Sequence, residues 1–195
     1  MSGVQVWLVR HGETEFNAQG RLCGWSDVAL TDNGRLQAGW LRGALAEERF
    51  DGVWSSDLGR ALETARLAWG AARPDARLRE IHFGELEGRD YTTLDEAQRA
   101  GLRDFADFAA PGGESLVSLT ERVNDFLDAL PSGRHLVFAH GGVLRAVMRQ
   151  VGPDRFLANG SLLVVDWSGR ELLRVIENAH ATASAVVRQS QQGDD

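Results

Sequence analysis

Short apolar runs of strand length alternate along this chain with longer segments in which apolar residues recur at helical spacing. The runs at residues 4–9, 50–55 and 134–139 are rich in β-branched and aromatic side chains, a composition typical of buried strands. Residues 32–49 and 57–70 carry apolar side chains every three or four positions, which predicts helices. We therefore expect an α/β fold of three layers, α/β/α, in which helices cover both faces of a mostly parallel central sheet.

Elements whose apolar periodicity is less clear are predicted from residues that typically begin or end helices and strands. Asp57 is predicted to cap the helix that follows it, and Ser118 with Glu121 matches a capping box. The remaining predicted elements are a short strand at 77–81, helical pieces around 94–108, a helix ended by Pro131, a helix after residue 140, and a hairpin of residues 162–167 and 171–176.

The length of 195 residues predicts one domain, and a chain of this size can bury a core without a metal or a disulfide. We place the domain at residues 1–188 and a polar tail at 189–195. Glycines and a Pro-Gly-Gly turn interrupt residues 89–113, which predicts a lid or insertion there.

The charge balance argues against two classes of partner. The chain has 28 acidic and 21 basic residues and a formal net charge of -7, which repels phosphate backbones and acidic membranes. We therefore expect neither nucleic acid nor a membrane as a partner. Every basic residue is an arginine. For most of these arginines we attribute this to a general bias in composition and not to a function. One consequence is that any bound anion would be held by guanidinium groups rather than by ammonium groups.

The single cysteine, Cys23, cannot form an internal disulfide and excludes zinc motifs built on paired cysteines. No segment has the pattern of a secretory signal or the length of a membrane span. These features predict a cytoplasmic protein.

Three residues whose side chains can take part in catalysis lie just beyond predicted strands. His11 follows the first strand, Arg60 lies near the start of the helix after the second, and His140 follows the strand at 134–139. Ligands gather beyond the carboxyl ends of strands in such sheets, so we expect these side chains to meet. A neutral imidazole is a competent nucleophile towards phosphorus, and guanidinium groups bind the oxygens of a phosphoryl group.

Six stretches in this order resemble motifs of the histidine phosphatase superfamily, the phosphoglycerate mutase-like enzymes. They are residues 8–14 with Arg10-His11-Gly12, 23–34, 55–65, 78–88, 111–115 and 140–142 with His140-Gly141-Gly142. The resemblance implies a phosphoglycerate mutase-like fold and a phosphoryl-transfer enzyme.

The resemblance also implies roles for individual residues. His11 would be the nucleophile, with His140 facing it across the phosphoryl group. Arg10 and Arg60 would clamp the phosphate, and Glu80 would be the general acid, with Glu85 as the alternative. Asn17, Cys23, Gly24 and Gly141 complete the expected phosphate and substrate contacts. Two arginines and two histidines suffice for this chemistry, so no metal or other cofactor is expected.

Other polar and aromatic residues have less support for a role at the site. His82 and Trp25 are candidate substrate contacts, although His82, like His135 and His180, is more often structural. Arg145 and Arg149 are one helical turn apart and are expected on a solvated helix face. Substrate specificity is expected from residues between Asp90 and Ala110, which include Tyr91, Phe105 and Phe108.

The function predicted from the sequence is a metal-independent phosphomonoester hydrolase that acts through a phosphohistidine on a small phosphorylated metabolite, as a monomer or homodimer. The pattern looks most like small bacterial broad-specificity phosphatases and α-ribazole phosphatases. Cofactor-dependent, phosphoglycerate mutase-type phosphoryl transfer is the first alternative, but only 22 residues separate Gly88 from Pro111, a short cover for a reaction that must exclude water. A phosphate- or phosphoprotein-binding module without catalysis is the second alternative. A histidine-carboxylate metal hydrolase is disfavoured because no two histidines have ligand spacing.

Overall fold

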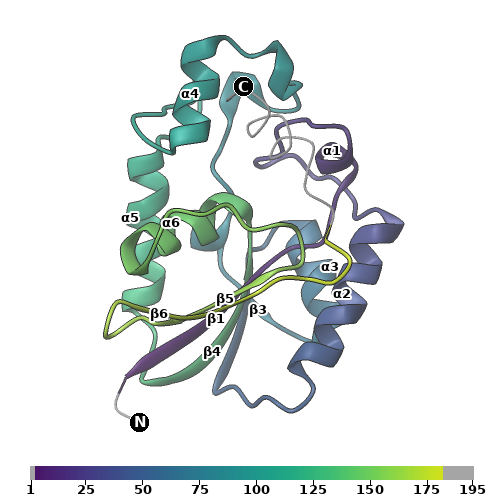
Figure 1. Ribbon diagram of the computed structural model, residues 1–195, viewed down its shortest axis with the longest axis vertical. Helices are drawn as coiled ribbons and strands as arrows, with labels where there is room; N and C mark the ends of the chain where they lie inside the picture. The colour runs from purple at the N-terminus through teal and green to yellow at the C-terminus, as the bar shows by residue number, and fades with distance from the viewer. Residues whose placement is uncertain (1–2, 182–195) are drawn as a thin grey trace.

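The computed structural model describes residues 3–181 and places a six-stranded sheet at its centre (Figure 1). The strand order is β3-β2-β4-β1-β5-β6, in which β1 to β4 run parallel while β5 and β6 are antiparallel to their neighbours. Their bounds are β1 Val4–Arg10, β2 Gly52–Ser55, β3 Arg73–Pro74, β4 Gly133–Ala139, β5 Leu162–Asp166 and β6 Glu171–Ile176. The mostly parallel sheet expected from the sequence is confirmed.

Helices cover both faces of this sheet. The longer ones are α2 Asp32–Leu45, α3 Gly59–Ala68, α4 Glu96–Asp104, α5 Leu116–Asp128 and α6 Gly141–Val151, with the single turn α1 Glu15–Ala18 and the 3-10 turns η1 Ala76–Leu78, η2 Gly84–Leu86 and η3 Tyr91–Thr93. Figure 1 shows α5 and α6 on one face, α2 and α3 on the other, and α1 and α4 beyond the carboxyl ends of the parallel strands. This is the three-layer α/β/α arrangement predicted above.

Side-chain alternation along β1 divides the apolar interior into two cores. Val6 and Leu8 belong to the core under α5 and α6, whereas Trp7 and Val9 belong to the core under α2 and α3. Successive residues of a strand point to opposite faces, so a strand buried on both faces reads as a continuous apolar run.

Three local predictions were wrong. Residues 77–81 form no strand, because η1 turns the chain at Ala76–Leu78 and the carbonyl groups that follow are taken by a helix side chain described below. Ser115, not Ser118, caps α5, since its hydroxyl accepts from the Ser118 N–H. Asp57 does not cap α3, because both of its carboxylate oxygens accept hydrogen bonds from Arg79.

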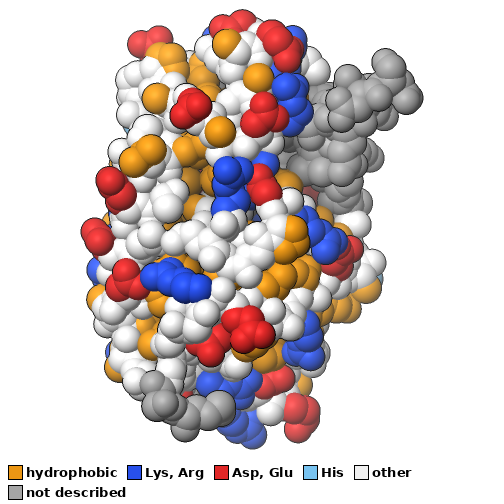
Figure 2. Space-filling view, turned by 60° about the vertical axis from the view of Figure 1, so that its left-hand side comes forward, with side chains coloured by type: hydrophobic (Ala, Val, Ile, Leu, Met, Phe, Trp, Pro, Cys, Tyr) orange, Lys and Arg blue, Asp and Glu red, His pale blue; other side chains and the backbone are white. Residues whose placement is uncertain are grey.

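The helix expected to reach residue 49 ends at Leu45. Beyond it the Ala46 N–H donates to the Gly43 carbonyl, an i to i−3 bond that tightens and closes the last turn. The polar tail predicted at 189–195 lies outside the described residues. Within residues 3–181, no helix is long and apolar enough to cross a bilayer. On the face drawn in Figure 2, acidic and basic side chains are interspersed rather than gathered in patches of one sign.

Candidate active site

The register of two neighbouring strands brings the two candidate histidines together. β1 and β4 are parallel with Arg10 opposite Ala139, so His11 and His140 leave the sheet at the same height. The His11 N–H donates to the Ala139 carbonyl at 3.0 Å, which extends the ladder by one residue. The two imidazole centroids lie 5.1 Å apart with their ring planes 62° apart.

The hydrogen bonds of His11 fix its tautomer. Its Nδ1 lies 2.6 Å from the Gly12 carbonyl oxygen, which can only accept, so Nδ1 carries the proton and Nε2 presents a lone pair. Arg60 Nε donates to that Nε2 at 3.3 Å. Burial, assisted by the charges of Arg60 and Arg10, holds the pKa of His11 well below its ordinary value. The ring is therefore neutral at pH 7, the form able to attack phosphorus.

His140 is fully buried, and it precedes α6 as an N-cap that makes no side-chain capping bond. Neither of its ring nitrogens has a hydrogen-bond partner among residues 3–181. Burial and the neighbouring Arg60 lower the pKa of His140 well below its usual value. A buried polar group without a partner is unfavourable, so this imidazole is suited to a ligand that supplies the missing hydrogen bond.

Arg10 and Arg60 converge on the histidines from the end of β1 and the first turn of α3. Arg10 donates to the Leu157 carbonyl at 2.6 Å and lies over the Phe156 ring at 4.5 Å, while its Nε has no partner among the described residues. Burial, only partly opposed by the carboxylate of Glu80, lowers the pKa of Arg10 to about 10. With this pKa Arg10 remains charged at pH 7, and both guanidinium groups can face an anion.

Arg60 was expected to clamp a phosphate, but most of its N–H donors already bind acceptors within the protein. Its two terminal nitrogens donate to the carbonyl groups of Ser26, Cys23 and Gly24 at 3.1, 3.3 and 2.5 Å, and its Nε donates to His11. The loop at 23–26 thus orients the guanidinium, and the Nε bond to His11 is the one that an incoming phosphoryl oxygen would replace.

Asn17 is held by its neighbours so that its amide faces the cavity. Its Oδ1 accepts from the Thr14 N–H at 3.1 Å, within a capping box of α1, and from Asn159 Nδ2 at 3.2 Å. Asn159 Nδ2 also lies 3.1 Å from the His11 carbonyl. With Oδ1 doubly occupied, Asn17 Nδ2 is the atom left to donate to a ligand.

Glu80 reaches the site from the irregular segment between η1 and η2. Its Oε1 accepts from the Ile81 N–H at 2.9 Å and its Oε2 from the Gly142 N–H at 3.0 Å. The Gly142 contact places the carboxylate at the first turn of α6, next to His140. Glu80 lines the same cavity as Arg10, His11 and Asn17.

The remaining walls of the cavity are mostly apolar, and the sequence predicted few of them. They are Leu22, Cys23, Ile81, Phe83, Leu102, Phe105, Leu116 and Phe156, with Arg21, Gly142 and Arg145. Phe156 and Arg21 are contributed by loops without a recognised motif. Arg145 corrects an expectation, because it lies in the cavity wall with its side chain only 11% exposed rather than on a solvated helix face.

Several predicted residues lie close to the site without lining the cavity. Gly24 supports Arg60 and donates to Glu87, and Gly141 packs against Phe156 and Arg10, where a side chain would crowd both. The rings of Trp25 and His82 contact one another outside the cavity, with centroids 4.6 Å apart and planes tilted by 47°. Arg60 and His140 are also absent from the cavity lining, although both are buried and both contact His11. The others outside it are Glu85, which is exposed, and Tyr91 and Phe108, which are buried in the core.

No group of three or more His, Cys, Asp or Glu side chains within residues 3–181 has an arrangement that could hold a metal ion. The site that remains is a buried pair of neutral imidazoles between two guanidinium groups, with a carboxylate at one side. Such a site can bind a phosphoryl group and supply a nucleophile and a proton donor to it.

Comparison with known proteins agrees with this arrangement. The chain matches the histidine phosphatase superfamily (branch 1) over residues 6–179, and it therefore belongs to that superfamily. The resemblance found in the sequence and the fold it implied are both confirmed.

Individual relatives carry two kinds of name. A "probable phosphoglycerate mutase GpmB" of Serratia proteamaculans is 39% identical over 160 residues, which is 76% of this chain and 74% of that protein. The crystal structure of TTHB049 from Thermus thermophilus superposes with a TM-score of 0.83 at 47% identity, covering 89% of this chain and 99% of the other. A "putative alpha-ribazole-5'-P phosphatase" of Escherichia coli strain K-12 has a TM-score of 0.77 at 28% identity, covering 93% and 98%.

Proposed function

We propose that this chain hydrolyses phosphomonoesters through a phosphohistidine at His11. Support comes from the lone pair of His11 Nε2, which lies between the cations Arg10 and Arg60 and opposite His140. A phosphoryl group there would receive hydrogen bonds from both guanidinium groups and would accept one from the ring N–H of His140, whose nitrogens have no partner among residues 3–181. Electrostatic stabilisation of this kind is the main contribution that a protein makes to phosphoryl transfer.

The proposed reaction has two displacements at phosphorus. In the first, His11 Nε2 forms a bond to phosphorus, the ester P–O bond breaks, and the Glu80 carboxyl gives its proton to the leaving oxygen. In the second, water attacks the phosphorus, the P–N bond breaks, the Glu80 carboxylate takes the water proton, and inorganic phosphate leaves. One carboxyl group serves both steps because the proton that it loses in the first is regained in the second.

The observation that favours hydrolysis of an apolar ester is the state of Arg145 in the cavity wall. Both oxygens of Asp154 accept from Arg145, at 2.7 and 2.9 Å, and the Leu102 and Arg103 carbonyls accept from two more of its five donors, at 3.0 and 2.7 Å. Its charge and its donors are thus engaged within the protein. A second anionic group on the substrate would have to compete with Asp154 for this guanidinium.

Arg21, which lines the cavity together with Arg10 and Arg145, is also held by the protein. Its Nε donates to the Gly88 carbonyl at 2.5 Å, and its guanidinium lies 4.0 Å from the centre of the Phe16 ring. Around the phosphoryl position the walls are aromatic and aliphatic. Such walls favour a phosphomonoester whose remaining part is uncharged and apolar over one that carries a carboxylate.

The names of several relatives favour a second candidate, phosphoryl transfer between positions of a phosphoglycerate. The deciding experiment measures inorganic phosphate release from phenyl phosphate and from 3-phosphoglycerate, and conversion of 3- to 2-phosphoglycerate, with EDTA present. We expect phosphate release from phenyl phosphate that is abolished by His11→Asn and preserved by Arg134→Lys at the other end of β4. Conversion of the glycerate without phosphate release would instead identify a mutase, and no reaction in either assay would contradict both.

A further inference from the structure

Glu80 lies on a stretch of backbone that has no ladder or helix to hold it. Residues 79–83 belong to neither η1 nor η2. A general acid has to keep its carboxyl group within hydrogen-bond reach of the leaving oxygen, and displacements of about 1 Å can lower rates by about 100-fold. Something other than regular secondary structure must therefore fix the position of Glu80.

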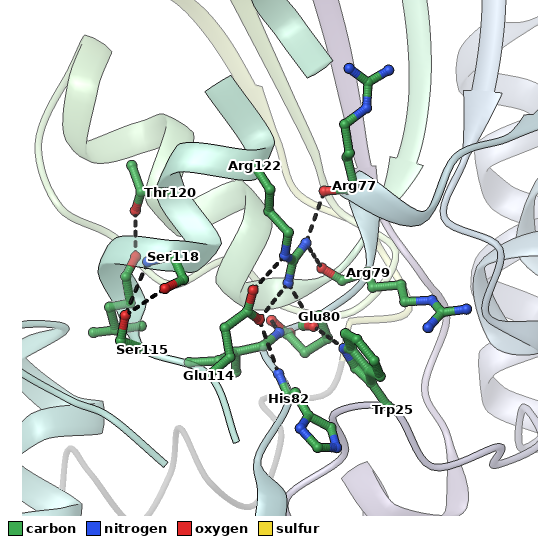
Figure 3. Close-up of polar contacts among 12 residues, drawn as sticks. Trp25, Arg77, Arg79, Glu80, His82, Glu114, Ser115, Ser118, Thr120 and Arg122 are labelled. Carbon is green, nitrogen blue, oxygen red and sulfur yellow. Dashed lines mark hydrogen bonds and ion pairs between the residues drawn. The ribbon is translucent and has the colours of Figure 1, made fainter. Parts of the chain in front are cut away.

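The side chain of Arg122, from the middle of α5, binds this backbone directly. Its Nη2 donates to the Glu80 carbonyl at 2.9 Å, and its Nη1 donates to the Arg79 and Arg77 carbonyls at 2.6 and 2.8 Å. Figure 3 shows the guanidinium between these carbonyl groups on one side and Glu114 on the other.

Glu114 holds Arg122 in a bidentate ion pair. Its Oε1 accepts from Arg122 Nε at 2.7 Å and its Oε2 from Nη2 at 2.8 Å. A guanidinium group has five N–H donors in a fixed planar fork, and here all five have acceptors. The two side chains are only 18% and 15% exposed, so solvent screens this pair less than a surface ion pair.

The carboxylate of Glu114 and the side chain of Trp25 also bind the backbone around Glu80. Glu114 Oε2 also accepts from the His82 N–H at 3.2 Å, and the Glu114 N–H donates to the His82 carbonyl at 2.9 Å. Trp25 Nε1 donates to the Glu80 carbonyl at 2.8 Å. The backbone is thus fixed on both sides of Glu80, and the Glu80 carbonyl receives two donors (Figure 3).

We propose that Arg122 and Glu114 are positioning residues that fix Glu80 for proton transfer. Neither is among the residues that line the cavity within residues 3–181, so they act through Glu80 and not on the substrate. This inference rests on the proposed function, because it requires Glu80 to protonate the leaving oxygen. Through these two residues, α5 and the 111–115 turn contribute to the protonation of the leaving oxygen.

The dependence of activity on the leaving group separates positioning from a purely structural role. An alkoxide leaves only when it is protonated, whereas p-nitrophenolate leaves without a proton. Misplacing Glu80 therefore lowers kcat/KM, which reports the first displacement, for an alkyl phosphate and largely spares kcat/KM for p-nitrophenyl phosphate. A general loss of folded protein would lower both rates equally.

The experiment compares kcat/KM for n-butyl phosphate and p-nitrophenyl phosphate in the wild type, Arg122→Lys and Glu114→Gln. Lysine keeps the charge but cannot serve five acceptors, and glutamine removes the ion pair. We expect losses of about 10- to 100-fold on the alkyl ester and of less than about 3-fold on the nitrophenyl ester. Trp25→Phe, which removes one of two donors to the Glu80 carbonyl, should show the same selectivity to a smaller degree.

Two further variants serve as controls for this comparison of rates. Glu80→Gln removes the acid and sets the full extent of the selectivity. Arg134→Lys disturbs an ion pair at the opposite end of the sheet, in which Arg134 lies 2.6 Å from Glu48 and the two side chains are 26% and 27% exposed. This substitution should change neither rate. If Arg122→Lys does not fold, Glu114→Gln and Trp25→Phe provide the comparison.

Equal losses on the two esters, or no loss on either, would overturn the positioning role while leaving the proposed hydrolysis intact. A wild-type chain that hydrolyses neither ester would contradict the proposed function and, with it, the inference that rests on it.

Discussion

The backbone N–H of Gly142 donates to Glu80 Oε2 at 3.0 Å, which ties the first turn of α6 to the carboxylate that we propose as the general acid. His140 immediately precedes this turn. The contact therefore fixes the distance between the proposed acid and the imidazole at the phosphoryl position. It also leaves no room for a side chain at residue 142, because a Cβ there would overlap Glu80 Oε1.

Gly142→Ala should therefore impair activity by displacing Glu80. We expect kcat on an alkyl phosphate to fall by about 10- to 100-fold and the free energy of unfolding to fall by about 1–3 kcal/mol, as is usual for overpacking. Phosphate release and urea unfolding measure the two effects.

Gly39→Ala is the matched control for that substitution. Gly39 is on an exposed face in the middle of α2, with open space where its Cβ would be. Alanine is the better helix former, so we expect about 0.5–1 kcal/mol of added stability and unchanged kcat. Retention of full activity by Gly142→Ala would show that the Glu80–Gly142 contact is dispensable.

The stability of the fold should depend on pH through its buried histidines. Burial and Arg60 keep the pKa of both His11 and His140 well below the ordinary value of 6.5 in the folded state. Below pH 6.5 the unfolded chain binds protons that the folded chain does not, so the free energy of unfolding falls as pH falls. Each histidine contributes a slope of about 1.4 kcal/mol per pH unit until its folded pKa is reached.

Urea unfolding at pH 7.5, 6.5 and 5.5 measures this slope. His140→Asn should reduce the slope below pH 6.5 by about 1.4 kcal/mol per pH unit relative to the wild type. An unchanged slope in the variant would show that His140 takes up a proton equally in the folded and unfolded states.

Phe105 should select for an apolar group on the substrate. It lines the cavity from the end of α4, whereas nearby Phe108 is buried in the core and does not line it. We expect Phe105→Leu to raise KM for phenyl phosphate by about 3- to 10-fold, from the loss of apolar contact, and to leave KM for methyl phosphate unchanged. Phe108→Leu should lower stability without changing this selectivity. A parallel change in both KM values for Phe105→Leu would argue against an apolar subsite.

The sequence was sufficient to predict which residues meet at the edge of the sheet. His11 and His140 directly follow apolar runs long enough to be strands, and parallel pairing of those strands brings the residues that follow to one height. The layer order follows from the same alternation. The strand predicted at 77–81 was wrong because its carbonyl groups bind Arg122, a contact across about 40 residues that no local pattern reveals.

Most of the cavity wall could not be predicted for the same reason. Arg145 looked like half of a solvated pair one helical turn apart, and only the fold shows that Asp154 and the carbonyl groups at the end of α4 surround it. Phe156 belongs to a loop without helical or strand periodicity. Its place against Arg10 depends on how that loop passes the end of β1, where the Gly160 N–H donates to the Arg10 carbonyl.

The most direct test of the account is to trap the phosphorylated protein. The wild type is mixed with ³²P-labelled phenyl phosphate, quenched in alkali within one turnover, and digested, and the labelled peptide is sequenced. Phosphohistidine is stable in alkali and labile in acid, so the account predicts an alkali-stable, acid-labile label on His11. This label should disappear as inorganic phosphate is released, and it should be absent from His11→Asn. Phosphate release without any labelled intermediate, or a label on another residue, would contradict the central role of His11.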